Sequence, residues 1–591
     1  VSVRCGGRKA WYSCRADTMY GWPGHAVAVT AVAAVVAVAH AAGPTTPSLV
    51  PDAVPSARDA PLYWCSWLAQ GRMWLANAST HNVSTVPTLE AYWRSRTHTD
   101  FMDQSNAANV FSNGSGSASG RVGWAWQFPA ARKDLIFVLD NGWQDGAESV
   151  SKSLTLSPSK YPEFASGNKT EAIGRLAAKV TALGWKGLGL WTAGGGAIGP
   201  DLIAVLGSAN VALLKFDGGD TACSETAIAR QAAPNVVVEH GDCGGDCPLN
   251  AAVGSDGRWP LAAATSQAKA LHCTDLFRTY DMVKILSVSE VLDRQAKLIL
   301  VAHNMSVPAE AKAMNPSPRR LFGGSGEPVV TAALGGSIQP MRGNLRGTPL
   351  PPLFEIYAGE GPRSRQRQHR EDEIVRLARW ARIAPPFGVG PQSDGTMEAA
   401  PLLDPVALIE AHNFSLCDDA CVISHKLEGK VVEQGAPARV TRNGLPLPDV
   451  KMPPPGIDPP PFVIATRFPG GKTFSVTTVG RQLLSGWVEA RAQVTLRVPA
   501  AASDTGVHIG VFGYYEQLTV VFEGGQRGDG VRTPTVLAQD LAGDTPEDIS
   551  SDVVWSGATV TIPGAVIEKV GLAARSREDD VSAPGLVLRV A

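Results

Sequence analysis

The sequence predicts an α/β protein in which a TIM (β/α)8 barrel is followed by a C-terminal antiparallel β-sandwich. Between residues 61 and 395, short apolar runs alternate with helical patterns. Strands that alternate with helices imply a parallel sheet, and eight such units imply a closed barrel. After residue 396, alternating apolar and polar runs at 462–466, 493–498 and 518–522 are bounded by Gly, Asn and Pro. Such runs are typical of antiparallel sheets.

The chain length and charge limit the remaining possibilities. At 591 residues, the chain is too long for one ordinary domain. The net charge of -2 gives no electrostatic reason to expect nucleic acid or an anionic membrane surface as a partner. We expect upstream residues and a secretory signal peptide at 1–42, a linker at 43–60, the barrel at 61–395 and the β-sandwich region at 396–591, with a Pro-rich insertion near 446–462.

The amino-terminal region has the pattern of a secretory signal peptide. Residues 26–39 form an apolar run of small side chains that only Thr30 interrupts, and a polar, Pro-rich stretch follows. The run is shorter than the roughly 20 residues that span a bilayer. A signal peptide therefore fits better than a signal anchor, which is the alternative. This predicts a secreted protein, or one in an endomembrane or vacuolar lumen, without a stable membrane anchor.

Sequons and cysteines agree with export. Six N-x-S/T sequons fit a glycosylated protein; they are at Asn77, Asn82, Asn113, Asn168, Asn304 and Asn413. In an oxidising compartment, the close pairs Cys243/Cys247 and Cys417/Cys421 are candidate disulfides. The mature chain would keep seven cysteines, so at least one thiol should stay free. A zinc site is an alternative for His240, Cys243, Cys247 and Cys273, although C-x-x-x-C is not a usual zinc spacing.

The barrel pattern places specific strands and helices. The expected strands are 63–68, 135–140, 187–191, 211–217, 236–240, 275–281, 298–303 and 329–334. The expected helices are 171–183, 200–206, 225–233, 287–297 and 371–382. The apolar run 211–214 leads directly to Asp217, which is followed by two glycines. A charged group is costly to bury, and it is easily presented at a strand end.

Polar and aromatic residues gather at the predicted strand ends. In a barrel of parallel strands, the carboxyl ends form the face on which chemistry occurs. The residues that converge there are Asp140, Trp143, Trp191, Lys215, Asp217, Glu239, Arg278 and Asp281. Any one of them alone could be a helix cap or part of a loop ion pair. Their joint position favours a functional site.

Two of these carboxylates suit glycoside hydrolysis. That reaction needs one carboxylate to attack the anomeric carbon and another to protonate the leaving oxygen. Asp217 ends the fourth predicted strand and Asp281 the sixth. Lys215 lies two residues before Asp217, so both side chains face the same side of the strand. Its charge should lower the pKa of Asp217. Trp143 and Trp191 could stack on a sugar ring.

Three motifs, in order, resemble those of the melibiase-type glycoside hydrolases. This clan contains α-galactosidases, α-N-acetylgalactosaminidases and raffinose synthases. The first motif, Asp-Asp-Gly-Trp in the family, is matched by Asp140-Asn141-Gly142-Trp143-Gln144. The Lys-x-Asp motif is matched by Lys215-Phe216-Asp217. The Arg-x-x-Asp motif is matched by Arg278-Thr279-Tyr280-Asp281. The similarity covers roughly residues 63–342.

The resemblance implies a retaining glycosidase that acts on a terminal α-galactoside, without a metal or an organic cofactor. Asp217 would be the nucleophile and Asp281 the acid/base, with their carboxyl groups about 5 Å apart. Asp140, Lys215 and Arg278 would bind sugar hydroxyls, and Glu239, at the end of the fifth predicted strand, is a looser candidate for the same role. Asn141, Trp143 and Trp191 complete the expected substrate-binding residues.

The chain departs from the family motif at Asn141, where the family has a second acid. This leaves the identity of the sugar open. A raffinose-synthase-like α-galactosyl transferase and a non-catalytic carbohydrate-binding protein on the same fold are the alternatives. The two predicted catalytic aspartates argue against the second alternative, because a binding module has no need of them.

Overall fold

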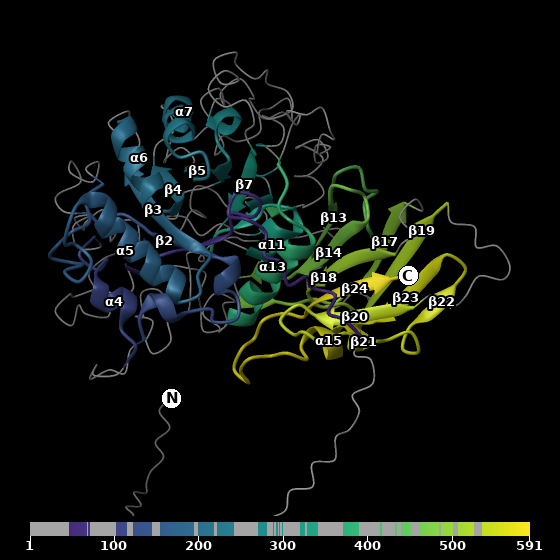
Figure 1. Cartoon of the computed structure of the whole chain (residues 1–591). Helices are drawn as coiled ribbons and strands as arrows, with labels where there is room; N and C mark the ends of the chain where they lie inside the picture. Colours follow the sequence, from purple (N-terminus) through teal and green to yellow (C-terminus); the bar gives the residue numbers. More distant parts are fainter. Residues whose placement is uncertain are drawn as a thin grey trace, which may run out of the picture. The chain divides into compact units, whose positions relative to one another are not determined.

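The computed structural model (Figure 1) describes residues 46–67, 69–70, 102–114, 122–144, 154–193, 199–217, 222–241, 270–279, 319–324, 328–340, 370–388, 439–451, 461–483, 486–499, 506–524 and 535–591, together with 288, 291–292, 295, 298, 414–415 and 432–433. These residues belong to one compact unit, 46–591. Some sequence predictions lie outside the described residues: the signal peptide, Asp281, four of the six sequons, and the cysteines at 243, 247, 417 and 421.

Eight parallel strands follow one another around a barrel in sequence order, and each is hydrogen-bonded to the next. The strands are β1 (Tyr63–Cys65), β2 (Ile136–Leu139), β3 (Gly187–Ala193), β4 (Val211–Asp217), β5 (Val237–His240), β6 (Leu276–Arg278), β7 (Leu321–Gly324) and β8 (Ser337–Ile338). The backbone N–H of Cys65 donates to the Pro340 carbonyl at 3.3 Å. This bond joins β1 to the segment after β8 and nearly closes the barrel. The predicted fold class of the barrel is therefore confirmed.

The predicted seventh and eighth strands are wrong. Leu298, in the predicted strand 298–303, is helical and fully buried. The predicted strand 329–334 is mostly the helix α11 (Pro328–Ala333), in which every residue is buried. A short, continuous apolar run does not reveal by its periodicity whether it is a buried helix or a buried strand. The true β7 has two glycines and the true β8 only two residues, so neither gives a clear pattern.

The predicted barrel helices are present where the structure describes them. They are α5 (Lys169–Ala182), α6 (Pro200–Ser208), α7 (Ala222–Ala232) and α13 (Glu371–Ile383), and the described residues between 288 and 295 are helical. Asn168 caps α5 by accepting from the Glu171 N–H, and the Glu171 side chain accepts from the Asn168 N–H. This reciprocal capping box satisfies two backbone donors at the helix start. A short helix, α4 (Ala107–Phe111), and two 3-10 turns, η2 (Trp124–Trp126) and η3 (Arg132–Asp134), lie between β1 and β2 in the sequence.

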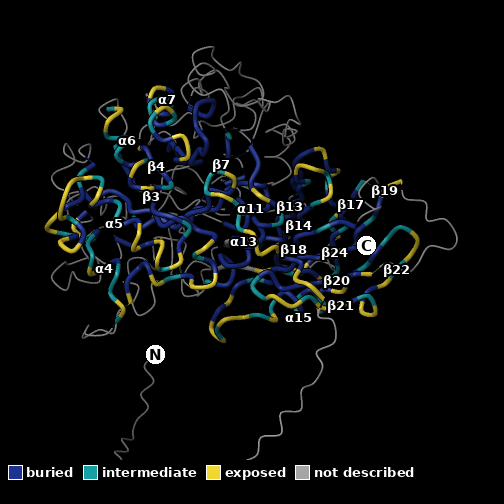
Figure 2. Tube along the Cα trace, in the orientation of Figure 1, coloured by how far each residue is buried: buried dark blue, intermediate teal, exposed yellow. Residues whose placement is uncertain are grey.

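The barrel strands alternate between two cores, so that most of their residues are buried (Figure 2). The side chains that face the barrel interior form a small apolar cluster. It contains Tyr63, Cys65, Ile136, Val138, Leu213, Val237, Leu276 and Leu321. The intervening residues, such as Phe137, Leu214 and Phe277, belong to the larger core that contains the helix side chains. The next inward positions after the apolar cluster are polar, and they form the candidate site.

The C-terminal region is a sandwich of two sheets that enclose one apolar core. The larger sheet has the order β11-β13-β14-β18-β24-β20-β21, and the smaller has the order β12-β17-β19-β23-β22. Their bounds are β11 (Arg439–Arg442), β12 (Asp449–Lys451), β13 (Phe462–Arg467), β14 (Thr473–Val479), β17 (Gln493–Pro499), β18 (Val507–Phe512), β19 (Gln517–Glu523), β20 (Val536–Asp540), β21 (Glu547–Asp548), β22 (Val554–Ser556), β23 (Thr559–Pro563) and β24 (Gly585–Val590). The remaining elements are β9 (Phe414–Ser415), β10 (Val432–Glu433), β15 (Arg481–Leu483), β16 (Gly486–Val488) and the helix α15 (Gly564–Gly571).

The predicted β-sandwich is present, but its sheets are mixed and not wholly antiparallel. The pairs β11/β13, β14/β18 and β17/β19 are parallel. The chain leaves the larger sheet after β14, forms β17 in the smaller sheet, and returns to pair β18 beside β14. A return by such a crossover brings the strand back in the same direction. Strand patterns in the sequence do not show which strands become neighbours.

The helix α13 connects the barrel to the sandwich through two buried ion pairs. Arg382 binds both carboxylate oxygens of Asp134 in the barrel, each at 2.7 Å. Arg376 binds both carboxylate oxygens of Asp540 on β20, at 2.9 and 3.0 Å. Paired planar groups of this kind fix both distance and orientation. Within the described part of the chain, no helix is both long and apolar enough to cross a membrane.

Candidate active site

Asp140 and Lys215 form a buried ion pair directly above the apolar barrel interior. Asp140 follows β2, Lys215 lies on β4, and the Lys215 ammonium bonds to Asp140 Oδ2. The Cys65 thiol donates to the same oxygen at 2.9 Å, and the Asn141 N–H donates to Oδ1 at 2.8 Å. Burial works against the charge of Lys215, but the Asp140 carboxylate outweighs it and raises the Lys215 pKa. Lys215 therefore remains charged.

Asp217 stands at the end of β4 and is the accessible carboxylate of the site. Its side chain is 48% exposed, whereas that of Arg278 is 2% exposed. Arg278 Nη2 donates to Asp217 Oδ1 at 2.7 Å, and Trp191 Nε1 donates to Oδ2 at 3.3 Å. Desolvation works against ionisation, but the charges of Arg278 and Lys215 and these hydrogen bonds outweigh it, so the pKa of Asp217 is lowered. An ionised, accessible carboxylate can act as a nucleophile.

Glu239 is close to these groups in the fold but is fully buried. Its two oxygens accept from the Tyr63 hydroxyl at 2.9 Å and from Gln339 Nε2 at 3.0 Å. Burial raises the pKa of Glu239 to about 7, although the charges of Arg278 and Lys215 oppose the rise. Glu239 therefore differs from Asp217 in exposure and in its ionisation.

Trp143 and Asn141 occupy different environments from those predicted. Trp143 has no exposed surface, and its indole N–H donates to the Trp191 carbonyl at 2.9 Å. In this structure, Trp143 offers no exposed face for the expected stacking on a sugar, and its indole supports Trp191. Asn141 is 4% exposed, and its Oδ1 is buried with no hydrogen-bond partner among the described residues. Buried polar atoms are normally paired, so this oxygen is suited to a ligand or water.

The structure brings Asp140, Lys215, Asp217, Glu239 and Arg278 together at the carboxyl ends of the strands. Asp281, the predicted acid/base, lies outside the described residues. Sequence reasoning missed three partners within the site: Tyr63, Cys65 and Gln339. Tyr63 and Cys65 lie on a strand that was predicted. Because alternate residues of a barrel strand face the interior, the sequence could have indicated that both side chains point toward the site. Gln339 follows β8, and the eighth strand was predicted at the wrong position in the sequence.

Gly241 provides the space through which Arg278 reaches Asp217. A Cβ at position 241 would overlap Arg278 Nη2, the atom that binds Asp217. We expect Gly241→Ala to displace the guanidinium and to lower kcat/KM by about 10- to 100-fold, because a hydrogen bond to a charged group contributes about 1.5–3 kcal/mol. The measurement is steady-state hydrolysis of an aryl glycoside.

Gly174→Ala is the matched control for that substitution. Gly174 lies in α5, and a Cβ there meets no atom within 4 Å. Alanine favours a helix over glycine by about 1 kcal/mol, so this variant should keep its activity and fold slightly more stably. If Gly241→Ala retains full activity, Arg278 does not act on Asp217 as described.

Cys223 and Cys273 form a disulfide between α7 and the segment before β6, a pair that the sequence analysis did not propose. The two cysteines are 50 residues apart, and such a separation gives no local signal.

The alternative zinc site cannot include Cys273, because the sulfur of Cys273 is in the disulfide. His240, another proposed ligand, is buried against Thr226 and stacks on Phe216. Burial lowers the pKa of His240 to about 3, so it is neutral. Cys65 is a free, buried thiol.

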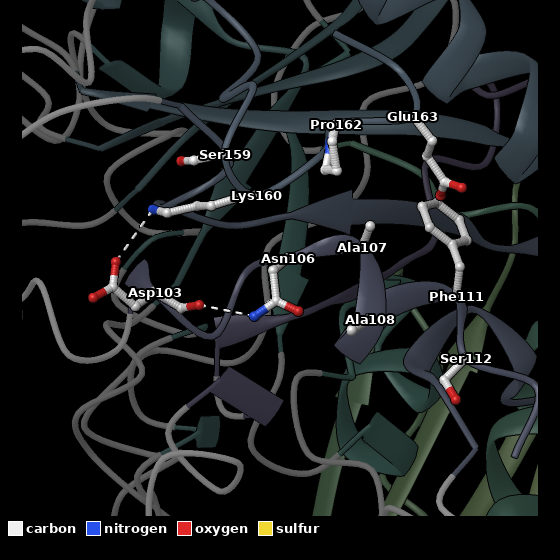
Figure 3. Close-up of a pocket in the computed structure, with 10 residues that line it drawn as sticks. All are labelled: Asp103, Asn106, Ala107, Ala108, Phe111, Ser112, Ser159, Lys160, Pro162 and Glu163. Carbon is white, nitrogen blue, oxygen red and sulfur yellow. Dashed lines mark hydrogen bonds and ion pairs between the residues drawn. The ribbon is translucent and has the colours of Figure 1, made fainter. Parts of the chain in front are cut away.

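An open pocket of about 750 Å³ lies between α4 and residues 159–163 (Figure 3). None of the predicted site residues lines it. At its edge, the Lys160 ammonium lies 3.6 Å from Asp103 and donates to the Gly142 and Met102 carbonyls at 3.0 and 3.2 Å. Gly142 belongs to the same loop as Asp140 and has φ +115°, and a Cβ there would overlap the Met102 backbone. Lys160 therefore fixes the loop that follows β2.

Removing the Lys160 ammonium should loosen this loop. We expect Lys160→Met to lower kcat/KM for an aryl glycoside by up to about tenfold, because it removes charge-assisted bonds of about 1.5–3 kcal/mol each from the backbone beside Asp140. Lys133→Met is the control, since Lys133 is exposed on η3. Equal activity in the two variants would show that Lys160 does not hold the loop in its active form.

Comparisons with known proteins give only distant similarity. No family model matches the chain, and no curated protein matches it. Among solved structures, the chain is similar to a GH27 β-L-arabinopyranosidase from Geobacillus stearothermophilus, with a TM-score of 0.30 and 9% identity over 79% of this chain and 92% of that one. A variant of that enzyme in complex with arabinose gives a TM-score of 0.28 and 10% identity over 77% and 88%. The carboxyl transferase domain of Rhizobium etli pyruvate carboxylase gives a TM-score of 0.24 and 13% identity over 52% of each chain. Likenesses at this level carry no argument about substrate or reaction.

Proposed function

We propose that this protein is a retaining glycoside hydrolase that cleaves O-glycosyl bonds, with terminal α-galactosides as the expected substrates. The observation that supports the proposal best is the state of Asp217, an accessible carboxylate with a lowered pKa at the carboxyl end of a barrel strand. This is the face on which barrel enzymes carry their active sites. The resemblance of the motifs around Asp140, Asp217 and Arg278 to those of the melibiase-type hydrolases gives the reaction class.

The reaction would proceed by double displacement. A carboxylate oxygen of Asp217 would attack the anomeric carbon, while Asp281 would give its proton to the departing glycosidic oxygen. The resulting glycosyl ester would then be cleaved by water, whose proton passes to Asp281, so that both carboxyl groups return to their starting states. Arg278 and Trp191 would hold the Asp217 oxygens in place, and the buried ion pair of Asp140 and Lys215 would support the site from beneath.

A panel of aryl α- and β-glycosides tests this proposal. The purified full chain should release the phenol from one or a few sugars, and proton NMR of the first product should show retention of the anomeric configuration. An inverted product would contradict the retaining mechanism. If no phenol is released with water alone, the same panel with a galactoside donor and a sucrose acceptor tests transglycosylation. Failure of both assays would exclude catalysis on these substrates.

We also propose that the protein works in a secretory lumen or outside the cell. The Cys223–Cys273 disulfide supports this location, because such bonds persist in oxidising compartments. A eukaryotic host that secretes the full chain should deliver it to the medium with this bond intact, as mass spectrometry of non-reduced peptides would show. Retention of the reduced chain in the cytosol would contradict the proposal.

A further inference from the structure

The surroundings of Glu239 do not fit the role of a sugar ligand. The side chain has no exposed surface, and each of its oxygens already has a protein partner. The barrel closes between β1 and the segment after β8. Tyr63 lies on β1 and Gln339 in that segment, so Glu239 is hydrogen-bonded to both sides of the closure. In this structure, no surface of this carboxyl is open to a sugar hydroxyl.

Gly323 makes this arrangement possible. It lies on β7, and a Cβ at this position would overlap the side-chain amide of Gln339. Its absence leaves the amide enough room to cross the barrel interior and donate to Glu239 at 3.0 Å. The site is therefore shaped by two glycines. Gly323 allows Gln339 to reach Glu239, and Gly241 allows Arg278 to reach Asp217.

Charged groups face Glu239 from the neighbouring strands. Lys215 is its direct partner in the β4–β5 register, and Arg278 lies two residues beyond Leu276, its partner on β6. Side chains two residues apart on a strand face the same side. Asp140 is bonded to Lys215 and contributes a negative charge. Arg278 is therefore the one described group that binds Asp217 directly and also interacts electrostatically with Glu239.

We propose that Glu239, held by Tyr63 and Gln339, is a positioning residue that acts through Arg278 on Asp217. When Glu239 is uncharged, it does not compete with Asp217 for the Arg278 guanidinium. When Glu239 is ionised, its charge draws the guanidinium away and weakens the arrangement of the nucleophile. This inference rests on the proposed function, because it assumes that Asp217 is the attacking group.

The direction of the pH dependence follows from this competition. Burial raises the pKa of Glu239 to about 7, against the opposing charges of Arg278 and Lys215 and the hydrogen bond from Tyr63. Below this pH the carboxyl is protonated and Arg278 serves Asp217. As the pH rises through about 7, Glu239 ionises and activity should fall. Asp217 has a lowered pKa, so it stays ionised throughout this range.

The test is the pH profile of kcat/KM for a dinitrophenyl glycoside of the sugar that the panel identifies. The dinitrophenolate leaves without a proton, so ionisation of Asp281 does not limit this step. In the unmodified protein, kcat/KM should fall at least about fivefold between about pH 6 and about pH 8. Glu239→Gln keeps an uncharged group of the same shape, so its profile should be flat over that range with KM nearly unchanged.

A second variant changes the ionisation of Glu239 without replacing it. Gln339→Met removes a donor to the ionised carboxylate, and its alkaline limb should move upward by roughly 0.5 to 1 pH unit. An alkaline limb that is unchanged in both variants would overturn the proposal. A large rise in KM for Glu239→Gln, with the profile unchanged, would also overturn it and make Glu239 a sugar ligand.

An optical measurement separates this proposal from the proposed function. In a pH-difference infrared spectrum, the unmodified protein should lose a protonated carboxyl band between about pH 6 and about pH 8, and Glu239→Gln should lack this change. If the protein turns over no glycoside but shows the band, the proposed function fails and the ionisation of Glu239 stands. If the band is absent, Glu239 does not titrate in this range and the positioning role is excluded.

Discussion

Asp217→Asn should lower kcat/KM for the best aryl glycoside by at least about a thousand-fold, because loss of a group that forms a covalent intermediate removes the main reaction path. Arg278 and Trp191 donate to different oxygens of Asp217, and an amide keeps only one of these oxygens. The amide also cannot attack the anomeric carbon. Initial rates of phenol release measure the loss. Binding of the free sugar should persist, since most of the contacts proposed for it come from other residues.

Azide provides the sharper form of this experiment. In Asp217→Gly, the small anion can enter the space that the carboxylate leaves and attack the same face of the sugar. It should restore part of the phenol release and give a glycosyl azide of inverted configuration. Asp201→Asn is the control, since Asp201 is an exposed residue in the first turn of α6. It should keep activity within about twofold, because its charge acts only on the helix end. Activity of Asp217→Asn equal to that of the control would remove Asp217 from the mechanism.

Arg376→Met should destabilise the protein by about 3–5 kcal/mol, the largest stability effect that we expect from one substitution. Arg376 and Asp540 are 1% and 3% exposed, and the variant leaves the Asp540 carboxylate buried without its cation. Two backbone N–H groups, of Ala542 and Ala574, would still bond to Asp540 at 2.8 Å but carry no charge. The midpoint of thermal unfolding should fall by roughly 3 °C or more.

Arg491→Met is the matched control for this effect. Arg491 also pairs with a carboxylate, that of Glu568, but the two side chains are 52% and 23% exposed. Exposed pairs contribute about 0–1 kcal/mol, so the unfolding midpoint should change little. If both variants melt alike, burial of the Arg376–Asp540 pair has no special energetic consequence. A fall in the Arg376 variant that appears only in the sandwich transition would locate the effect to that side of α13.

The first six strands of the barrel and its main helices could be predicted because their local patterns are distinct. Strands such as 211–217 are apolar and end in charge, and α5 combines a capping box with an apolar face. The last two strands could not be predicted, because β8 is two residues long and α11 is buried on every side. Which short segment becomes the last strand depends on the strand edges that the rest of the barrel leaves unpaired. The local sequence does not show those edges.

The sequence by itself determined which polar residues end the strands, and hence that Asp140, Lys215, Asp217, Glu239 and Arg278 should meet at one face. Only the tertiary structure decided how they differ. Asp217 is left accessible beside Arg278, whereas Glu239 is sealed by Tyr63 and Gln339 from the two strands at the barrel closure. Burial and charge around a carboxyl depend on residues far apart in the chain, so its pKa and its role emerge only when the barrel closes.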